Sequence, residues 1–368
     1  MLSGSLDSRK QKRISALQES MAAEGINAYY VTDPFNLRYI SGFTGTSGTA
    51  LITANNAYFI TDFRYREQAK AQCAGYEIII AGGSAAHTSP LRFVQSVVVN
   101  ENLGQLGYEE EYMTVAKFDE LEDIVSARLI PASGMIEALR QTKDQEEITT
   151  IQRACEIADA AFEHILGFIQ VGMTEIQVAN ELDFFMRSQG ASGVSFETIV
   201  ASGYRSAMPH GVASDKVIEA GDIVTMDYGC YYKGYVSDIT RTIAVGEPSS
   251  KMKEIYDVVF QANQLVNEQA KAGMTGEEMD AIARDFIASH GYGDDFGHSL
   301  GHSIGLDIHE SPNASIHNKQ PLKEYTVITN EPGIYLEGIG GVRIEDDIIL
   351  TEDGNKVLTH SPRHLIIV

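Results

Sequence analysis

Residues Asp222 to Thr242, DIVTMDYGCYYKGYVSDITRT, decide the fold of the second half of this chain. They predict two strands joined by a turn, because β-rich residues flank the dipeptide Lys233-Gly234. Alternate residues of a strand share a face, so Asp227 and Asp238 can lie side by side once the two arms pair. Two carboxylates on one inward face repel each other and lose hydration, at a cost of several kcal/mol. A bound cation is the simplest compensation.

A second hairpin of the same kind is expected near the C-terminus. Glu331 and Glu345 flank the turn signal EGIGG at residues 337–341, and Arg343 shares a face with Glu345. Between the two hairpins, the stretch DFGHSLGHSIGLDIHE contains His298, His302 and His309 in a glycine-punctuated setting. A set of four carboxylates and one imidazole from separate stretches is a more specific pattern than any single pair of acids.

Two similar sequence segments indicate an internal duplication of the second half. VGMTEIQVANELDFFM and AGMTGEEMDAIARDFI each follow a long helical pattern, over residues 143–170 and 250–271. Thr174 to Gln177 has the form of a capping box that starts the next helix. Each copy then continues into an antiparallel strand pair with two acids. We therefore expect a duplicated α+β domain with its acids at the centre.

The first part of the chain alternates strand and helix patterns, which predicts a compact α/β domain. Asp33-Pro34 is expected to form a turn after the strand at 26–32, and the segment at 131–141 is the expected boundary. The predicted domains are residues 1–132 and 133–368, in agreement with the two-domain expectation for a chain of 368 residues.

Composition narrows the function classes. A formal charge of -23 argues against a nucleic-acid partner, because phosphate binding needs clustered Lys and Arg. The sequence contains neither a secretory signal nor an apolar run that would span a membrane. Three widely separated cysteines, Cys73, Cys155 and Cys230, predict a reducing compartment rather than disulfides or a thiolate metal cage. We expect a cytoplasmic protein that acts on small molecules.

Five motifs stand out in the second half: MDYG, YVSDITRT, GHSIGLDIHE, NEPGIY and GVRIEDD. Together they resemble the motifs of the pita-bread metallopeptidases, a family that includes aminopeptidase P, prolidase and methionine aminopeptidase. The resemblance implies an α/β N-terminal domain of the creatinase type and an α+β pita-bread catalytic domain with pseudo-twofold symmetry. It also implies that two divalent ions are held by five residues: Asp227, Asp238, His302, Glu331 and Glu345. This oxygen-rich set favours Mn²⁺, with Co²⁺ or Zn²⁺ as alternatives.

The resemblance implies roles for further residues. His210 and His309 are expected to stabilise the oxyanion and to pass a proton to the leaving nitrogen, and Glu331 to accept the proton of the attacking water. His298, Tyr335 and Arg343 match positions that line a proline pocket. Their alternative interpretations are a core histidine, a packed tyrosine and an arginine that fixes Glu345.

The expected activity is hydrolysis of Xaa-Pro bonds at the N-terminus of peptides, in the manner of aminopeptidase P, because SGFTGTSG and ITDFRY resemble that branch. The alternative is an Xaa-Pro dipeptidase (prolidase), and a remote alternative is a binding protein on the same fold. The expected partners are small peptides with proline in second position and, as in many members of the family, a second copy in a homodimer.

Overall fold

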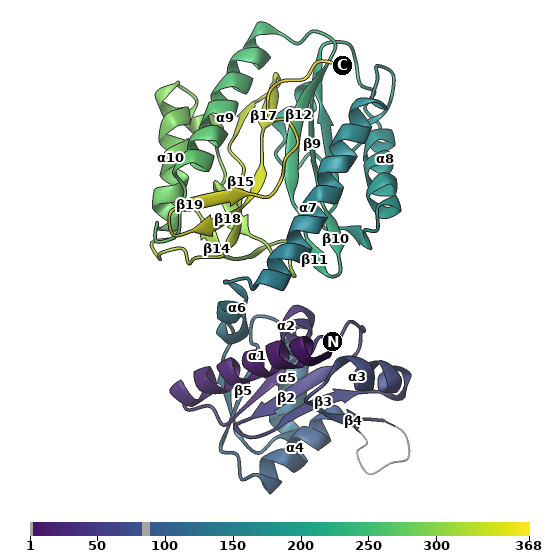
Figure 1. Cartoon of the computed structure of the whole chain (residues 1–368), viewed down its shortest axis with the longest axis vertical. Helices are drawn as coiled ribbons and strands as arrows, with labels where there is room; N and C mark the ends of the chain where they lie inside the picture. The colour runs from purple at the N-terminus through teal and green to yellow at the C-terminus, as the bar shows by residue number, and fades with distance from the viewer. Residues whose placement is uncertain (1–2, 83–88) are drawn as a thin grey trace. The chain divides into compact units, whose positions relative to one another are not determined.

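The structure, a computed structural model, describes residues 3–82 and 89–368. The chain divides into two units, Met1–Arg140 and Gln141–Val368. Each unit has sheet strands covered by helices (Figure 1). The expected boundary after residue 132 stays a prediction. In the described part of the chain, no helix is both long and apolar enough to cross a bilayer.

The first unit contains one mixed six-stranded sheet in the order β4-β3-β2-β1-β5-β6. Its strands are β1 (Ala28–Val31), β2 (Thr49–Thr53), β3 (Ala57–Thr61), β4 (Glu77–Ile80), β5 (Gln105–Tyr108) and β6 (Arg128–Pro131). Its helices are α1 (Ser3–Ala23), α2 (Pro34–Ser41), α3 (Arg66–Gln72), α4 (Pro90–Asn100), α5 (Val115–Ile124) and α6 (Met135–Arg140). The α/β architecture expected for this part of the chain is therefore present.

One local expectation in the first unit is wrong. Asp33-Pro34 does not form a simple turn but starts α2, because the Asp33 side chain accepts a hydrogen bond from the Asn36 amide and Pro34 occupies the first helical turn. The segment expected to hold the boundary, 131–141, contains α6, and the buried Arg140 at its end donates to the Asn36 side chain. This tertiary contact attaches α6 to the first unit.

The second unit is built from two similar halves. Its helices are α7 (Gln145–Leu166), α8 (Glu175–Ser188), α9 (Ser250–Gln269) and α10 (Gly276–Ser289). The predicted capping box at Thr174 is confirmed, and Thr275 forms its counterpart at the start of α10. The halves also repeat a backbone bond: Gly172 N donates to Ile218 O, and Gly273 N donates to Leu322 O. The sequence duplication is therefore also a structural one.

The strands of the second unit form both expected hairpins. They are β7 (Gly193–Val194), β8 (Ile199–Ser202), β9 (Asp222–Tyr228), β10 (Cys230–Tyr232), β11 (Tyr235–Val236), β12 (Ile239–Val245), β13 (Gly301–Ser303), β14 (Glu310–Ala314), β15 (Val327–Asn330), β16 (Gly333–Leu336), β17 (Gly340–Arg343), β18 (Asp346–Thr351) and β19 (Gly354–Val357). β9 pairs antiparallel with β12, while β15 and β16 pair with β18 and β17. The turn between β10 and β11 contains Lys233 and Gly234, both at positive φ.

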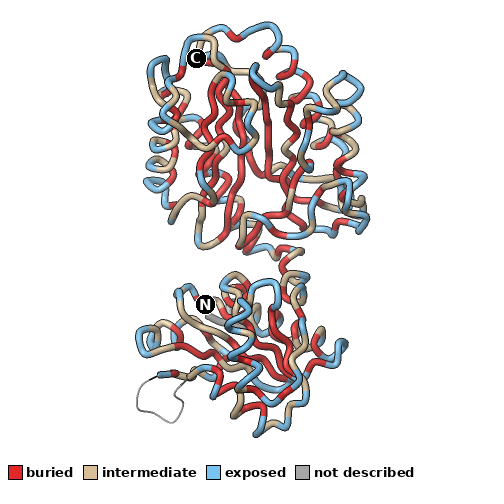
Figure 2. The backbone as a smooth tube through the Cα atoms, turned by 180° about the vertical axis from the view of Figure 1, so that it is seen from behind, coloured by how far each residue is buried: buried red, intermediate tan, exposed pale blue. Residues whose placement is uncertain are grey.

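Each half has its own apolar core. One core joins α7 and α8 to β8, β9 and β12, and the other joins α9 and α10 to β15, β17 and β18. The buried strands run through the middle of the unit, with exposed positions on the helices outside them (Figure 2). Polar side chains at the centre are therefore enclosed by two packed layers.

Arg241 joins the two halves at their centre. The Glu345 amide donates to Thr240 O across the junction, and Arg241, only 1 % exposed, donates to the Glu345 carbonyl. The same guanidinium pairs with buried Asp346 at 2.8 Å and donates to Ser361 O. A single buried cation therefore fixes the backbone on both sides of the junction.

We expect Arg241→Met to lower the free energy of unfolding by about 3 to 5 kcal/mol, because removal of one partner of a buried ion pair leaves Asp346 with only one cation contact, the longer one to Arg363 at 3.5 Å. Urea denaturation followed by circular dichroism measures this change. Arg153→Met is the control, since Arg153 pairs with Glu156 at the surface, where a pair contributes about 1 kcal/mol or less. Equal losses in the two variants would contradict the role given to Arg241.

Candidate active site

The first hairpin places two carboxylates on one face. In the register of β9 and β12, Asp227 lies opposite Thr240 and Thr225 lies opposite Thr242. The hydroxyls of Thr225 and Thr242 are 3.1 Å apart, which shows that these alternate residues share a face. Asp238 precedes Thr240 by two residues and is therefore on this face too. The strand parity predicted from the sequence is confirmed.

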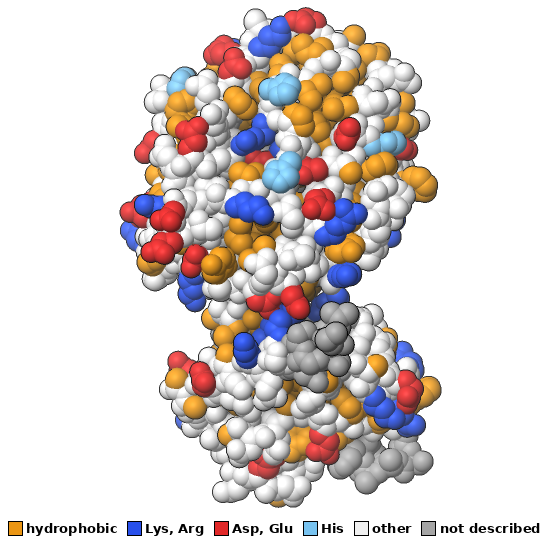
Figure 3. All heavy atoms as spheres, in the orientation of Figure 1, with side chains coloured by type: hydrophobic (Ala, Val, Ile, Leu, Met, Phe, Trp, Pro, Cys, Tyr) orange, Lys and Arg blue, Asp and Glu red, His pale blue; other side chains and the backbone are white. Residues whose placement is uncertain are grey.

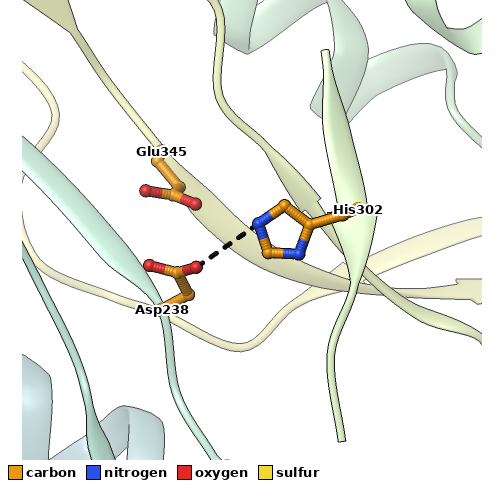
Figure 4. A group of neighbouring side chains, drawn as sticks. All are labelled: Asp238, His302 and Glu345. Atoms are coloured by element: carbon orange, nitrogen blue, oxygen red, sulfur yellow. Dashed lines mark ion pairs between the residues drawn. The ribbon is translucent and has the colours of Figure 1, made fainter. Parts of the chain in front are cut away.

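Three side chains converge at the centre of the unit. His302 comes from β13, Asp238 directly precedes β12, and Glu345 lies between β17 and β18. One ligand atom from each lies within 4.8 Å of the others, and His302 Nε2 is 3.6 Å from Asp238 Oδ2. Figure 4 shows the three side chains pointing toward a common centre. Asp238 and Glu345 are buried, and His302 is partly exposed. This grouping is suited to a metal ion.

The other two expected ligands lie beside this group. Glu331 Oε1 is 3.5 Å from His302 Nε2 and accepts a hydrogen bond from the Thr329 hydroxyl. Asp227 pairs with Arg343 at 2.7 Å. All five side chains line one cavity of about 500 Å³, together with His210, His298, His309 and Arg343. Figure 3 shows acidic, basic and histidine side chains gathered on one face of this unit.

Burial and crowding raise the affinity of these carboxylates for protons. Burial raises the pKa of Asp238 well above its usual range, and the carboxylates of Glu345 and Asp227 raise it further. Burial, then the Glu331 carboxylate, also raises the pKa of Glu345. Burial raises the pKa of Glu331 to about 8, although the Arg343 guanidinium acts in the opposite direction. Burial lowers the pKa of His302 to about 4, so its imidazole is neutral at pH 7. The site therefore needs cations or protons.

The donor atoms fit divalent metal ions. Among the described residues, the buried Oδ1 atoms of Asp227 and Asp238 have no hydrogen-bond partner, although such atoms are normally satisfied. A neutral imidazole beside carboxylate oxygens is a ligand set that Mn²⁺ and similar ions accept. A bound cation would satisfy these oxygens and would offset the cost of burying the carboxylates together.

The three residues expected to line a proline pocket form a hydrogen-bonded chain. Arg343 donates to the Tyr335 hydroxyl at 2.8 Å, and that hydroxyl lies 2.9 Å from His298 Nε2. His298 Nδ1 is 2.8 Å from Ser299 O, so both ring nitrogens have partners. His298 lines the cavity, and Tyr335, which does not line it, is bonded to His298.

The alternative role of Arg343, fixing Glu345, stays a prediction, because the contact of Arg343 with Glu345 is indirect. Its guanidinium pairs with Asp227, while Glu345 accepts from the Thr240 hydroxyl at 2.6 Å. Arg343 Nε donates to Thr240 Oγ1 at 3.0 Å, so Thr240 links the two. Arg343 therefore reaches Glu345 only through an intermediate hydroxyl.

Sequence reasoning missed several supporting residues. Asp347 accepts from the Asp238 amide at 2.9 Å, and Cys155 Sγ, from α7, lies 3.3 Å from the same carboxylate. Burial raises the pKa of Asp347 to about 8. Thr240 could have been found, because it follows Asp238 by two residues on the same face. Asp347 could not, because its partners are more than 100 residues away.

His210 and His309 are exposed at the cavity, on the loop after η2 (Gly203–Ala207) and on the loop before β14. The His309 ring lies 4.4 Å from the ring of His302, between centroids. Neither side chain belongs to the three-residue metal group. Their position leaves them accessible to a molecule in the cavity.

Comparisons with known proteins agree with this architecture. Residues 149–352 match the model of metallopeptidase family M24, and residues 13–142 match the Creatinase/Prolidase N-terminal domain. The fold class expected from the sequence is confirmed. A curated relative from Pyrococcus furiosus, named Xaa-Pro dipeptidase, is 40 % identical over 97 % of this chain and 100 % of its own.

Two solved structures are also similar over nearly the whole chain. An Xaa-Pro dipeptidase from Bacillus anthracis is 51 % identical, with a TM-score of 0.95, over 98 % of this chain and 100 % of its own. An X-Pro aminopeptidase from Thermotoga maritima is 42 % identical, with a TM-score of 0.87, over 94 % of this chain and 98 % of its own. With its carboxylate-rich centre and both domain matches, the chain belongs to metallopeptidase family M24 and is a metallo-exopeptidase.

Proposed function

We propose that the protein is an Xaa-Pro dipeptidase whose second unit holds two divalent metal ions. The observation on which this rests is the cavity that gathers Asp227, Asp238, His302, Glu331 and Glu345, with unsatisfied oxygens on the two aspartates. The names of the P. furiosus and B. anthracis proteins favour the dipeptidase over the aminopeptidase P-like activity that the sequence phrases favoured. The similarity to the T. maritima protein keeps that second activity as the alternative.

The chain's own residues would divide the reaction among them. The five ligand side chains would hold the ions, which lower the pKa of a bound water and polarise the scissile carbonyl. Glu331 would accept the proton of the attacking water, since its carboxylate lines the cavity beside His302. His210 and His309, exposed at the cavity, would donate to the developing oxyanion and to the leaving proline nitrogen.

His298, Tyr335 and Arg343 would form the wall on which the proline ring rests. The ring nitrogens of His298 are occupied, so its contribution to binding is the face of the ring rather than a hydrogen bond. Burial lowers the pKa of His298 to about 4, so this ring is neutral at pH 7. Arg343 lines the cavity with His298, and the Tyr335 hydroxyl would hold the two side chains together through its hydrogen bonds.

The remaining expectations are part of the same proposal. Mn²⁺ is supported by the hard oxygen donors, and a cytoplasmic location by three buried cysteines without disulfides. A homodimer rests on the family resemblance, and the division at residue 132 rests on the boundary segment at 131–141.

The ligand and acid-base roles can be separated by two substitutions. Asp238→Asn should reduce bound Mn²⁺ and lower hydrolysis of an Xaa-Pro dipeptide to about 1 % or less, because a buried carboxylate ligand is lost. His210→Ala should lower kcat by about 10²- to 10³-fold with metal content unchanged, because a donor to the oxyanion is lost. Elemental analysis and initial rates measure both. Loss of metal from the His210 variant would contradict its assigned role.

The metal-free protein should become less stable as pH rises from about 5 to 8. Glu331 has a pKa of about 8 in the folded chain and an ordinary value of 4.5 when unfolded. In this window the folded state binds a proton that the unfolded state releases, so stability falls with pH. The thermal midpoint should fall by several degrees, and added Mn²⁺ should stabilise most at pH 8. Glu331→Gln is the control and should reduce the fall of the thermal midpoint with pH. An equal fall in both proteins would contradict the assignment of this effect to Glu331.

Substrate length distinguishes the two activities. With Mn²⁺ supplied, we expect kcat/KM for an Xaa-Pro dipeptide to exceed that for an Xaa-Pro-Yaa tripeptide by about tenfold or more, because the free carboxylate of proline would contribute a charged hydrogen bond. The matched control is the dipeptide amide, which keeps the length but lacks the charge. Equal rates on all three would favour the aminopeptidase, and activity that survives removal of the metal would overturn both.

A further inference from the structure

The loop that contains His309 is closed by the side chain of the next residue, Glu310. One carboxylate oxygen of Glu310 accepts from the Leu306 amide at 2.9 Å and from the Asp307 amide at 3.1 Å. A Cβ at Gly305 would lie 2.7 Å from both carboxylate oxygens, so only glycine lets the backbone come this close. The carboxylate is thus the centre around which residues 305–310 fold.

The other oxygen of Glu310 pairs with Lys143, which comes directly before α7. Lys143 Nζ lies 3.1 Å from Glu310 Oε2, and the two side chains are 1 % and 5 % exposed. The partners are 167 residues apart in the chain. The Lys143 amide also donates to Tyr325 O at 3.0 Å, which fixes the backbone there. A charge pair so deeply buried is tolerated only when both partners are held in place.

A second contact ties this loop to the start of α7. The Val236 amide, in β11, donates to Gly305 O at 2.9 Å. The neighbouring Tyr235 hydroxyl donates to Glu147 in the first turn of α7 at 2.8 Å. Two separate routes therefore connect that turn to the loop, and the one through Lys143 reaches the Glu310 carboxylate directly.

We propose that Lys143 is a positioning residue for His309, acting through Glu310. The proposal rests on the proposed function, in which His309 donates to the reacting group. His309 is joined directly to Glu310, and its ring contacts that of the expected ligand His302. Loss of the ammonium removes the cation that lies 3.1 Å from this buried carboxylate, which raises the cost of keeping the charge buried and favours opening of the loop. The expected defect lies in turnover rather than in metal binding.

Kinetics of matched variants test this role. Lys143→Met should lower kcat for an Xaa-Pro dipeptide by about 10- to 100-fold, with KM and Mn²⁺ content nearly unchanged. Adding Glu310→Gln should restore most of the rate, because the amide oxygen still accepts from the loop and no buried charge remains. The control is Lys216→Met, which breaks a partly buried pair with Asp222 and should leave kcat unchanged. A loss of kcat in Lys143→Met no larger than in Lys216→Met overturns the proposal.

Two further measurements exclude a merely structural effect. In a His309→Ala background, Lys143→Met should change kcat less than about twofold, because residues that act through one another are not additive. Full additivity would overturn the proposal. Hydrogen exchange at the Leu306 and Asp307 amides should accelerate in Lys143→Met but not in Lys216→Met, and unchanged exchange would also overturn it. Exchange does not depend on activity, so this result stands even if the wild-type protein fails to cleave Xaa-Pro substrates.

Discussion

Repulsion among buried carboxylates is the constraint on which the second unit depends. Asp238 and Glu345 are buried beside Asp227 and Glu331, and Arg343 is the only lysine or arginine among the described residues that line their cavity. One guanidinium cannot compensate four carboxylates, so the folded chain needs either bound protons or divalent cations. Protons are lost as pH rises, whereas divalent ions stay bound, because deprotonated ligands bind metal more tightly. A metal-binding centre is thus the arrangement that lets this sequence keep its acids together near neutral pH.

The duplicated architecture explains why the acids meet at all. Each half supplies a helix pair and a strand pair with its own apolar core, so each hairpin is held by packing within its own half. The junction is held by the bond from the Glu345 amide to Thr240 O and by the buried guanidinium of Arg241. Each contact lies within three residues of Asp238 or Glu345. The interactions that join the halves therefore also set the spacing of the ligands.

Local patterns predicted the hairpins, the capping box at Thr174 and the shared face of Asp227 and Asp238, because strand parity and helix capping depend on neighbours in the chain. The supporting contacts could not be predicted in this way. Arg241 and Asp346, Asp238 and Asp347, and Lys143 and Glu310 are joined across more than 100 residues, and no spacing rule connects them. The start of α2 was missed for a different reason: Asp33-Pro34 is equally typical of a turn and of a helix N-terminus, and only packing decides between them.

The geometry also limits how a dipeptidase could recognise the carboxylate of its substrate. The guanidinium of Arg343 already binds Asp227, Tyr335 and Thr240, and both nitrogens of His298 have partners. A guanidinium moved to a substrate carboxylate would lose its hydrogen bonds to Asp227, Tyr335 and Thr240, a cost that one new hydrogen bond does not offset. Within this unit, the exposed imidazoles of His210 and His309 remain as donors at the cavity. Selection of dipeptides would then depend on the same histidines that take part in the reaction. Motifs that dipeptidases and aminopeptidases share therefore do not distinguish the two activities.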